Sequence, residues 1–141
     1  SGGQKRRAAI AGIMAMRPEV LVLDEPSAGL DPAGKKSIFE GIRNYAEATG
    51  AAVIIVSHSM DDVAEYVDRI IVMNKGKVMY DDDPNVVFMH YRELEEVGLG
   101  APQVTYIIKA LKDKGLPVNE GPTTVDEAAD EIMRALQQRN A

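Results

Sequence analysis

The sequence predicts an α/β fold: a parallel-sheet portion with its helices, then an antiparallel hairpin and a small helical tail. Two continuous apolar runs, Val20–Leu23 and Ala52–Val56, are typical of parallel strands buried on both faces. Helical patterns precede and separate these runs, so strand and helix alternate. After Asp83 the pattern becomes purely helical. We therefore expect one domain portion over residues 1–83 and a helical appendage over residues 84–141.

The first elements follow from local signals. A helix is expected over Gln4–Met16, because the residue before Pro18 avoids the helical region. After the first strand, Asp31 acts as an N-cap with a proline at the first helical position. That second helix is expected to run to about Thr49, where a glycine ends it. The second strand follows directly.

Later elements are shorter. Ser59 with Asp62 is expected to open a short helix as a capping box. Arg69–Met73 reads as a strand that turns through Asn74-Lys75-Gly76 into Lys77–Tyr80, which predicts a hairpin. Two helical stripes follow in the tail, and the second begins with a Thr124-x-x-Glu127 capping box. Their apolar members are Val104, Ile107, Ile108 and Leu111, then Val125, Ala128, Ala129, Ile132 and Leu136.

Composition narrows the class of protein. The 141 residues are 45% apolar, enough for a core, and the net charge of −6 argues against a nucleic-acid partner, which needs a basic face. The absence of cysteine excludes a disulfide framework or thiolate metal site and fits a reducing cytosol. The apolar runs are too short to span a bilayer, and no secretory signal is visible. Because the chain starts without Met, we expect a fragment of a longer protein.

Two carboxylates, Asp24 and Glu25, come directly after the first apolar strand. Ligands of open α/β sheets bind beyond the carboxyl ends of the strands, so this pair suits a Mg²⁺–phosphate site. One carboxylate can hold the metal, and the other can orient or deprotonate a water. The dipeptide alone is equally compatible with two solvated acids that end a strand.

His58 follows the second apolar strand with one residue between them. If the two strands are parallel neighbours, their carboxyl ends share an edge and His58 faces the same site as Glu25. An imidazole there can hydrogen-bond a terminal phosphate. Taken alone, a loop histidine without a role is the commoner outcome.

Two further segments have both a functional and a plain structural interpretation. Ser1-Gly2-Gly3-Gln4 leads into a helix, where backbone N–H groups and the helix dipole can bind an anion, or where Ser1 is only an N-cap. Asp31 contributes about 0.5–2 kcal/mol as a helix cap. It also lies just after the acidic pair, in a loop placed to touch a partner subunit.

The order and spacing of these segments resemble the ABC (ATP-binding cassette) ATPase family over about residues 1–80. Ser1–Gln4 looks like the signature motif without its leading residue, and Val20–Glu25 looks like Walker B plus the catalytic glutamate. Ser27–Asp31 resembles the D-loop, and His58 resembles the switch histidine. The resemblance implies part of a P-loop NTPase core that binds ATP between two head-to-tail subunits.

The resemblance also implies roles. Asp24 would bind the Mg²⁺ that accompanies ATP, Glu25 would polarise the attacking water, and His58 would contact the γ-phosphate. Asp31 would communicate across the dimer. The ATP held by the other subunit would be contacted by Ser1, Gly2, Gly3 and Gln4.

One departure from the family is large. The sequence contains no G-x-x-x-x-G-K-[ST] loop, and the upstream glutamine loop is missing too. Without that backbone cradle and its lysine, phosphate binding is weak. We expect ATPase activity in the full-length protein, and neither strong ATP binding nor hydrolysis in the 141-residue chain alone.

Three kinds of ABC protein compete: a transporter ATPase, a DNA-repair or chromosome ATPase, and an ABC-F translation factor. Pro26–Asp31 favours the transporter, because ABC-F proteins usually carry an Asn-His pair before the Leu-Asp. The acidic balance disfavours both nucleic-acid classes. The tail segments Glu93–Thr105, Lys114–Pro117 and Thr124–Ala128 resemble the C-terminal region of energy-coupling factor (ECF) transporter ATPases.

The ECF resemblance implies an importer of a vitamin or of cobalt or nickel, with this ATPase on the cytoplasmic face of the membrane. Its partners would be a second ATPase subunit, identical or homologous, and integral membrane subunits. The tail would meet the partner ATPase, although its stripes equally fit packing on its own domain. For the chain by itself, a non-catalytic module that dimerises through its tail is the remaining alternative.

Overall fold

The structure is a computed structural model that describes residues 2–139. The chain forms two compact units, one ending at His58 and one beginning at Ser59. The hairpin expected in the first domain portion belongs to the second unit, because its buried Val72 shares a core cluster with Val87 and Phe88. The compact units therefore divide earlier in the chain than the boundary expected from the sequence at residues 83 and 84. The assignment of residues 1–83 to the ATPase domain and of residues 84–141 to an appendage stays a prediction.

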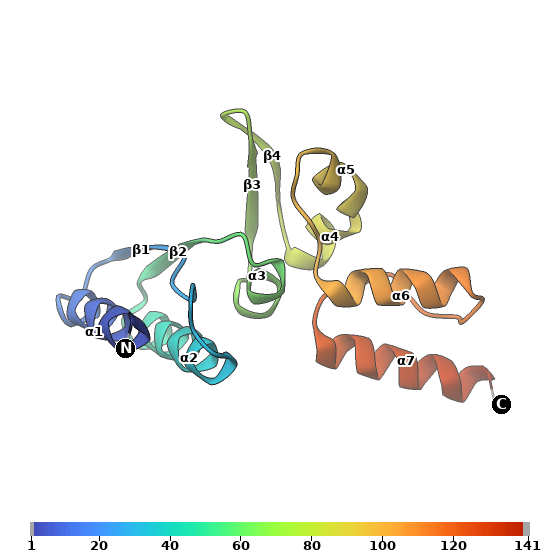
Figure 1. Ribbon diagram of the computed structural model, residues 1–141, viewed down its shortest axis with the longest axis horizontal. Coiled ribbons are helices and arrows are strands. Elements are labelled where there is room, and N and C mark those ends of the chain that lie inside the picture. The colour runs from blue at the N-terminus through green and yellow to red at the C-terminus, as the bar shows by residue number, and fades with distance from the viewer. Residues whose placement is uncertain (1, 140–141) are drawn as a thin grey trace. The chain divides into compact units, whose positions relative to one another are not determined.

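The first unit pairs two strands in parallel. Val20 lies opposite Ala52, and Asp24 lies opposite Val56. Figure 1 shows both helices of this unit below the strand pair in that view. The elements of the unit are α1 (Gly2–Ala15), β1 (Val20–Asp24), α2 (Pro32–Thr49) and β2 (Ala52–Val56).

The strand pair is buried on one face only. On that face Leu21 and Leu23 are buried, α2 packs on β2, and α2 contributes its own buried side chains. The opposite face carries exposed apolar side chains, which are Val20, Val22, Ile54 and Val56, each more than half exposed. The expectation of burial on both faces is therefore wrong for the described residues, because the helices cover a single side.

The ends of α2 form as the sequence predicts. The Asp31 side chain accepts a hydrogen bond of 3.0 Å from the Gly34 N–H, and Pro32 is the first helical residue. At the other end Gly50 has φ of 71° and donates its N–H to the Ala46 carbonyl. These caps fix where the loop between β1 and α2 ends.

The second unit begins with α3 and a hairpin. The strands β3 and β4 are antiparallel, with a register shift between Val72 and Met73. Lys75 and Gly76 have φ of 48° and 76°, which suits the two-residue turn that matches strand twist. The elements are α3 (Met60–Tyr66), β3 (Ile70–Asn74), β4 (Lys77–Asp82), α4 (Pro84–Met89), α5 (Tyr91–Glu96), α6 (Gln103–Asp113) and α7 (Val125–Arg139).

Two apolar clusters hold this unit together. One joins α3, the hairpin, α4 and α5 through Ala64, Val72, Val87, Phe88, Leu94 and Ala101. The other joins α6 to α7 through Val104, Ile108, Val118, Ala128 and Ala135. The predicted tail stripes are only partly buried, since Ile107, Val125 and Leu136 are exposed. The buried residues of α7 are Ala128, which belongs to the predicted stripe, and Ala135, which does not.

The two predicted capping boxes have different outcomes. The Thr124 hydroxyl accepts a hydrogen bond from the Glu127 N–H, and the Glu127 carboxylate accepts one from the Thr124 N–H. This reciprocal pair confirms the box before α7. Ser59 is the N-cap of α3, but its side chain makes no capping bond. Asp62 is one methylene shorter than the glutamate usual in this motif.

Membrane insertion has no candidate helix in the described part of the chain. Between residues 2 and 139, no helix combines the length and the apolar character that crossing a bilayer requires.

Candidate functional site

The carboxyl ends of β1 and β2 bring Glu25 and His58 together. The Glu25 N–H donates to the Val56 carbonyl at 2.8 Å, which extends the parallel ladder by one residue past Asp24. The chain then leaves β2 through Ser57. Glu25 Oε1 accepts a hydrogen bond of 2.9 Å from the His58 N–H and lies 2.6 Å from its ring Nδ1. The acid and the imidazole thus share one rim of the sheet.

Glu25 has a backbone conformation that marks the position. Its φ is 46°, in the left-handed region that non-glycine residues seldom adopt. Such a residue stores on the order of 1–3 kcal/mol of strain and persists only when its surroundings hold it. The Ala28 N–H donates to the Glu25 carbonyl at 3.2 Å, so a tight turn begins at this residue.

Asp24 ends β1 one residue before Glu25, and its side chain is exposed. A single exposed carboxylate fits a Mg²⁺ that takes one or two protein ligands and completes its shell with water and substrate phosphate. Over the part of the chain that the structure describes, no group of three or more His, Cys, Asp or Glu side chains could hold a metal ion. The donor set therefore fits a substrate-associated Mg²⁺ and not an all-protein metal cage.

The segment that resembles the signature lies at the start of α1. Ser1 is outside the described residues, and Gly2 to Gln4 form the first turn of the helix, so the helix begins earlier than the expected Gln4. Gly3 lies against the loop after β1, where an added Cβ would stand 2.5 Å from Leu30 Cδ2. Because Leu30 Cδ2 is the end of a flexible side chain, a side chain at position 3 would require Leu30 to shift.

A polar cavity of about 600 Å³ opens between α1 and that loop. Asp31 lines it in addition to capping α2. The cavity brings the signature-like turn and Asp31 together, but neither Glu25 nor His58 is among its lining residues, which are Gly3, Gln4, Arg6, Arg7, Ala28, Gly29, Leu30, Asp31 and Gly34. The expected site residues thus fall into two groups: the sheet rim and this cavity.

Sequence reasoning missed Arg6. Its guanidinium Nη1 donates to the Glu25 carbonyl at 3.0 Å and to the Ala28 carbonyl at 2.6 Å. Arg6 is half-buried, whereas its neighbours Lys5 and Arg7 are exposed. The one available signal was the helical spacing of three that puts Arg6 on the same face as Gly3.

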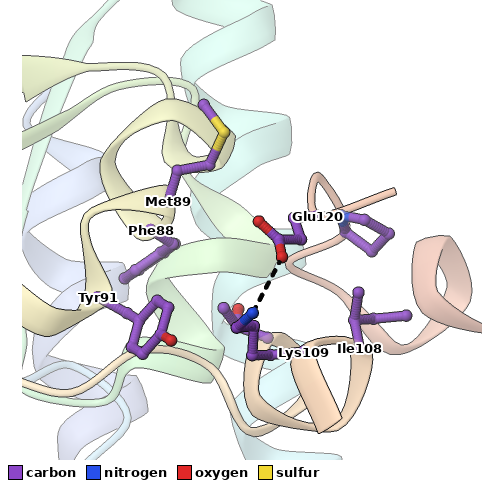
Figure 2. Close-up of a pocket in the computed structure, with 8 residues that line it drawn as sticks. Phe88, Met89, Tyr91, Ile108, Lys109 and Glu120 are labelled. Atoms are coloured by element: carbon purple, nitrogen blue, oxygen red, sulfur yellow. Dashed lines mark ion pairs between the residues drawn. The ribbon is translucent and has the colours of Figure 1, made fainter. Parts of the chain in front are cut away.

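A small cavity of the second unit is shown in Figure 2. It lies among Phe88, Tyr91 and Ile108, with Lys109 and Glu120 forming an ion pair of 3.5 Å across it. Its volume of about 20 Å³ holds roughly one water, which excludes a substrate. The buried Thr105 hydroxyl, which has no hydrogen-bond partner among residues 2–139, belongs to a residue that lines the same space.

A protein-family model matches the N-terminal part of the chain. Residues 1–61, which include both groups of site residues, match the model described as "AAA domain, putative AbiEii toxin, Type IV TA system". This match covers less than half of the chain. It includes the signature-like turn, the acidic pair and His58.

Curated relatives cover nearly the whole chain. It is 48% identical over 139 residues to the "Energy-coupling factor transporter ATP-binding protein EcfA2" of Clostridium tetani, covering 99% of this chain and 48% of that protein. It is 49% identical over 137 residues to the protein of the same name from Acetivibrio thermocellus, covering 97% and 49%. The chain spans about half the length of the curated relatives it matches.

A solved structure agrees with these relatives. The protein cbiO1 of Clostridium perfringens, described as part of the ABC transporter complex cbiONQ, superposes with a TM-score of 0.59 at 38% identity. The match covers 77% of this chain and 43% of that one. In sequence and fold the chain is therefore similar to ATPases of ABC transporters, and in sequence to the ATP-binding proteins of energy-coupling factor transporters.

Proposed function

We propose that the whole protein carrying this chain is the ATP-hydrolysing subunit of an ABC importer of the energy-coupling factor type. The observation that carries the proposal is the contact of 2.6 Å between Glu25 and His58 at the carboxyl ends of two parallel strands. Ligands of such sheets bind at that edge. The transporter names of the relatives favour this function over DNA repair and translation.

Each residue at the rim has a task that its position allows. Glu25 presents a carboxylate whose orientation is fixed by the His58 N–H, so it can polarise the water that attacks the γ-phosphate. His58 can then contact that phosphate through its ring. Asp24, one residue earlier and exposed, would hold the Mg²⁺ that accompanies ATP, where the ion would supply charge neutralisation for the phosphates.

The second group serves a different nucleotide. Ser1, Gly2, Gly3 and Gln4 close on the ATP bound by a second ATPase subunit. Backbone N–H groups and the positive end of α1 suit a phosphate there. Asp31, at the edge of the same cavity, communicates between the subunits. A dimer is therefore part of the proposal, with integral membrane subunits that receive the motion on the cytoplasmic face.

The tail is proposed to meet the second ATPase. Exposed apolar side chains on α6 and α7 support a contact with another chain, and they are Ile107, Val125, Met133 and Leu136. Because the second compact unit begins at Ser59, residues 59–141 are the segment to sediment. Concentration-dependent association supports tail dimerisation, and a monomer at every concentration removes it.

The catalytic assignment is tested by Glu25→Gln in the whole protein. The variant keeps the shape of the side chain but removes its charge, so it should bind and trap ATP. Turnover should fall on the order of 10²–10³-fold, as expected for one transition-state group. Glu19→Gln is the matched control, since Glu19 is exposed and precedes the opposite end of β1.

Wild-type turnover by Glu25→Gln would show that the assignment is wrong. The 141-residue chain alone should show no ATPase activity above that of its own Glu25→Gln variant, because the phosphate cradle is not in it. Glu25-dependent turnover by the isolated chain would contradict that second expectation.

A further inference from the structure

We propose that Arg6 is a positioning residue that fixes Glu25 through the backbone of the loop after β1. The inference rests on the proposed ATPase function and adds a residue to it. Arg6 lies on α1, 19 residues before Glu25, yet its guanidinium reaches the carbonyls of Glu25 and Ala28. It joins the signature-like helix to the segment that carries the acid.

The two carbonyls bracket one tight turn. The Ala28 N–H donates to the Glu25 carbonyl at 3.2 Å, and Arg6 Nη1 donates to that same oxygen at 3.0 Å and to the Ala28 oxygen at 2.6 Å. A hydrogen bond from a charged donor is about twice as strong as a neutral one. The guanidinium therefore bonds to both ends of the turn and reinforces the backbone bond that already joins them.

The backbone conformation of Glu25 has to be stabilised by its contacts. Its φ of 46° is unfavourable for a residue with a side chain and persists only if surrounding contacts enforce it. The contacts described at Glu25 are the ladder bond to Val56, the pair with His58, the turn bond from the Ala28 N–H and the Arg6 bond. The first two come from the sheet rim, and the third comes from the turn itself. Arg6 is the contact that comes from α1.

A second contact couples α1 to the same loop. Gly3 approaches so closely that a Cβ on it would stand 2.5 Å from Leu30 Cδ2. Gly3 and Arg6 are three residues apart and share a helix face. The first turns of α1 thus meet the loop at two places, through the Arg6 hydrogen bonds near its start and through Gly3 beside Leu30 near its end.

The consequence concerns the link between two nucleotide sites. In the proposed dimer the start of α1 closes on one ATP, while Glu25 of the same chain acts on another. A shift of α1 on closure moves the Arg6 guanidinium and with it the Glu25 backbone. Arg6 thus makes the placement of the catalytic carboxylate depend on closure of the signature turn.

The experiment uses the whole protein assembled with its partner subunits and compares Arg6→Met, Arg6→Lys and Lys36→Met. Arg6→Met keeps length but removes both hydrogen bonds, and we expect kcat to fall about tenfold with the KM for ATP changed less than about twofold. Arg6→Lys keeps a charged donor, so its kcat should stay closer to the wild-type value than to that of Arg6→Met. Lys36→Met removes an exposed cation of α2 paired only weakly with Glu40, and it should leave kcat unchanged.

A direct structural readout accompanies the kinetics. In Arg6→Met the Ala28 amide, which donates within the turn, should exchange with deuterium faster, while amides of β2 should keep their wild-type rates. Unchanged Ala28 exchange, or a kcat loss shared equally by Arg6→Lys and Arg6→Met, overturns the inference.

Failure of the inference is distinct from failure of the proposed function. If Glu25→Gln abolishes turnover but Arg6→Met retains wild-type kcat, Arg6 does not position the acid and the ATPase assignment stands. If Glu25→Gln itself turns over normally, the proposed function fails first. A fall in kcat that only matches a loss of folded protein, measured by thermal unfolding of the same sample, also overturns the role of Arg6.

Discussion

Two adjacent isoleucines in α6 allow the effect of burial on the stability of the tail to be measured. Ile108 is 1% exposed and lies in the cluster that joins α6 to α7, whereas Ile107 is 52% exposed. Replacing each by alanine removes the same atoms from the same helix. The two variants should therefore differ only through the environment of the side chain.

The size of the effect follows from the neighbours of Ile108. Its cluster contains two valines and two alanines, and the longer side chains of Leu111, Leu116 and Ile132 pack against it. These longer side chains can fill part of the space that the isoleucine leaves. Ile→Ala in a core costs about 2–5 kcal/mol, depending on how far the neighbouring side chains relax into the space. We expect about 3 kcal/mol for Ile108→Ala and no more than about 0.5 kcal/mol for Ile107→Ala.

Amide exchange of α6 and α7 measures this difference in the intact subunit. Because each 1.4 kcal/mol is a factor of ten, exchange should rise about 10²-fold in Ile108→Ala and about twofold in Ile107→Ala. The subunit is measured before assembly, so that a partner cannot cover Ile107. Equal exchange in the two variants would refute the burial difference and the placement of the α6–α7 interface.

Two further predictions concern caps and charge. Asp31→Ala removes the bond to the Gly34 N–H and should destabilise α2 by about 1 kcal/mol in denaturant unfolding, whereas Asp31→Ser should retain the cap; equal losses would contradict the cap's contribution. Hydrogen bonds from Arg134 and from the Asn119 N–H lower the pKa of Glu131 from 4.5 to about 2. This carboxylate therefore stabilises the tail above pH 4.5, and its contribution is lost as the pH falls toward 2. Glu131→Gln should flatten the acid-unfolding curve followed by circular dichroism in that window, and an unchanged curve would contradict it.

The placement of Glu25 beside His58 was predictable because both residues follow the carboxyl ends of strands. Two apolar runs followed by an acidic pair and by His58 place those groups at one edge once the strands are parallel neighbours, and the register bears this out. The caps of α2 and α7 were predictable for a similar reason. Each depends on side chains within four residues of one another, so tertiary structure has little influence on them.

Features that depend on contacts between residues far apart in the sequence were not predictable. Lys5, Arg6 and Arg7 read alike in sequence, and only the position of the loop selects Arg6. The left-handed backbone of Glu25 has no sequence signal, since that conformation favours glycine. Helical periodicity placed Ile107 and Ile108 in one stripe, but α7 packs close to α6 through alanines and covers only Ile108.

A double-mutant cycle on Glu25 and His58 tests whether the two side chains act together in ATP hydrolysis. Single-turnover ATP hydrolysis is measured for the whole protein with Glu25→Gln, His58→Ala and both changes together. Because the two side chains are in contact at 2.6 Å and act on one phosphate, the double variant should be no slower than the worse single variant within about threefold. Losses that multiply in the double variant would show that Glu25 and His58 act independently and would contradict the shared site.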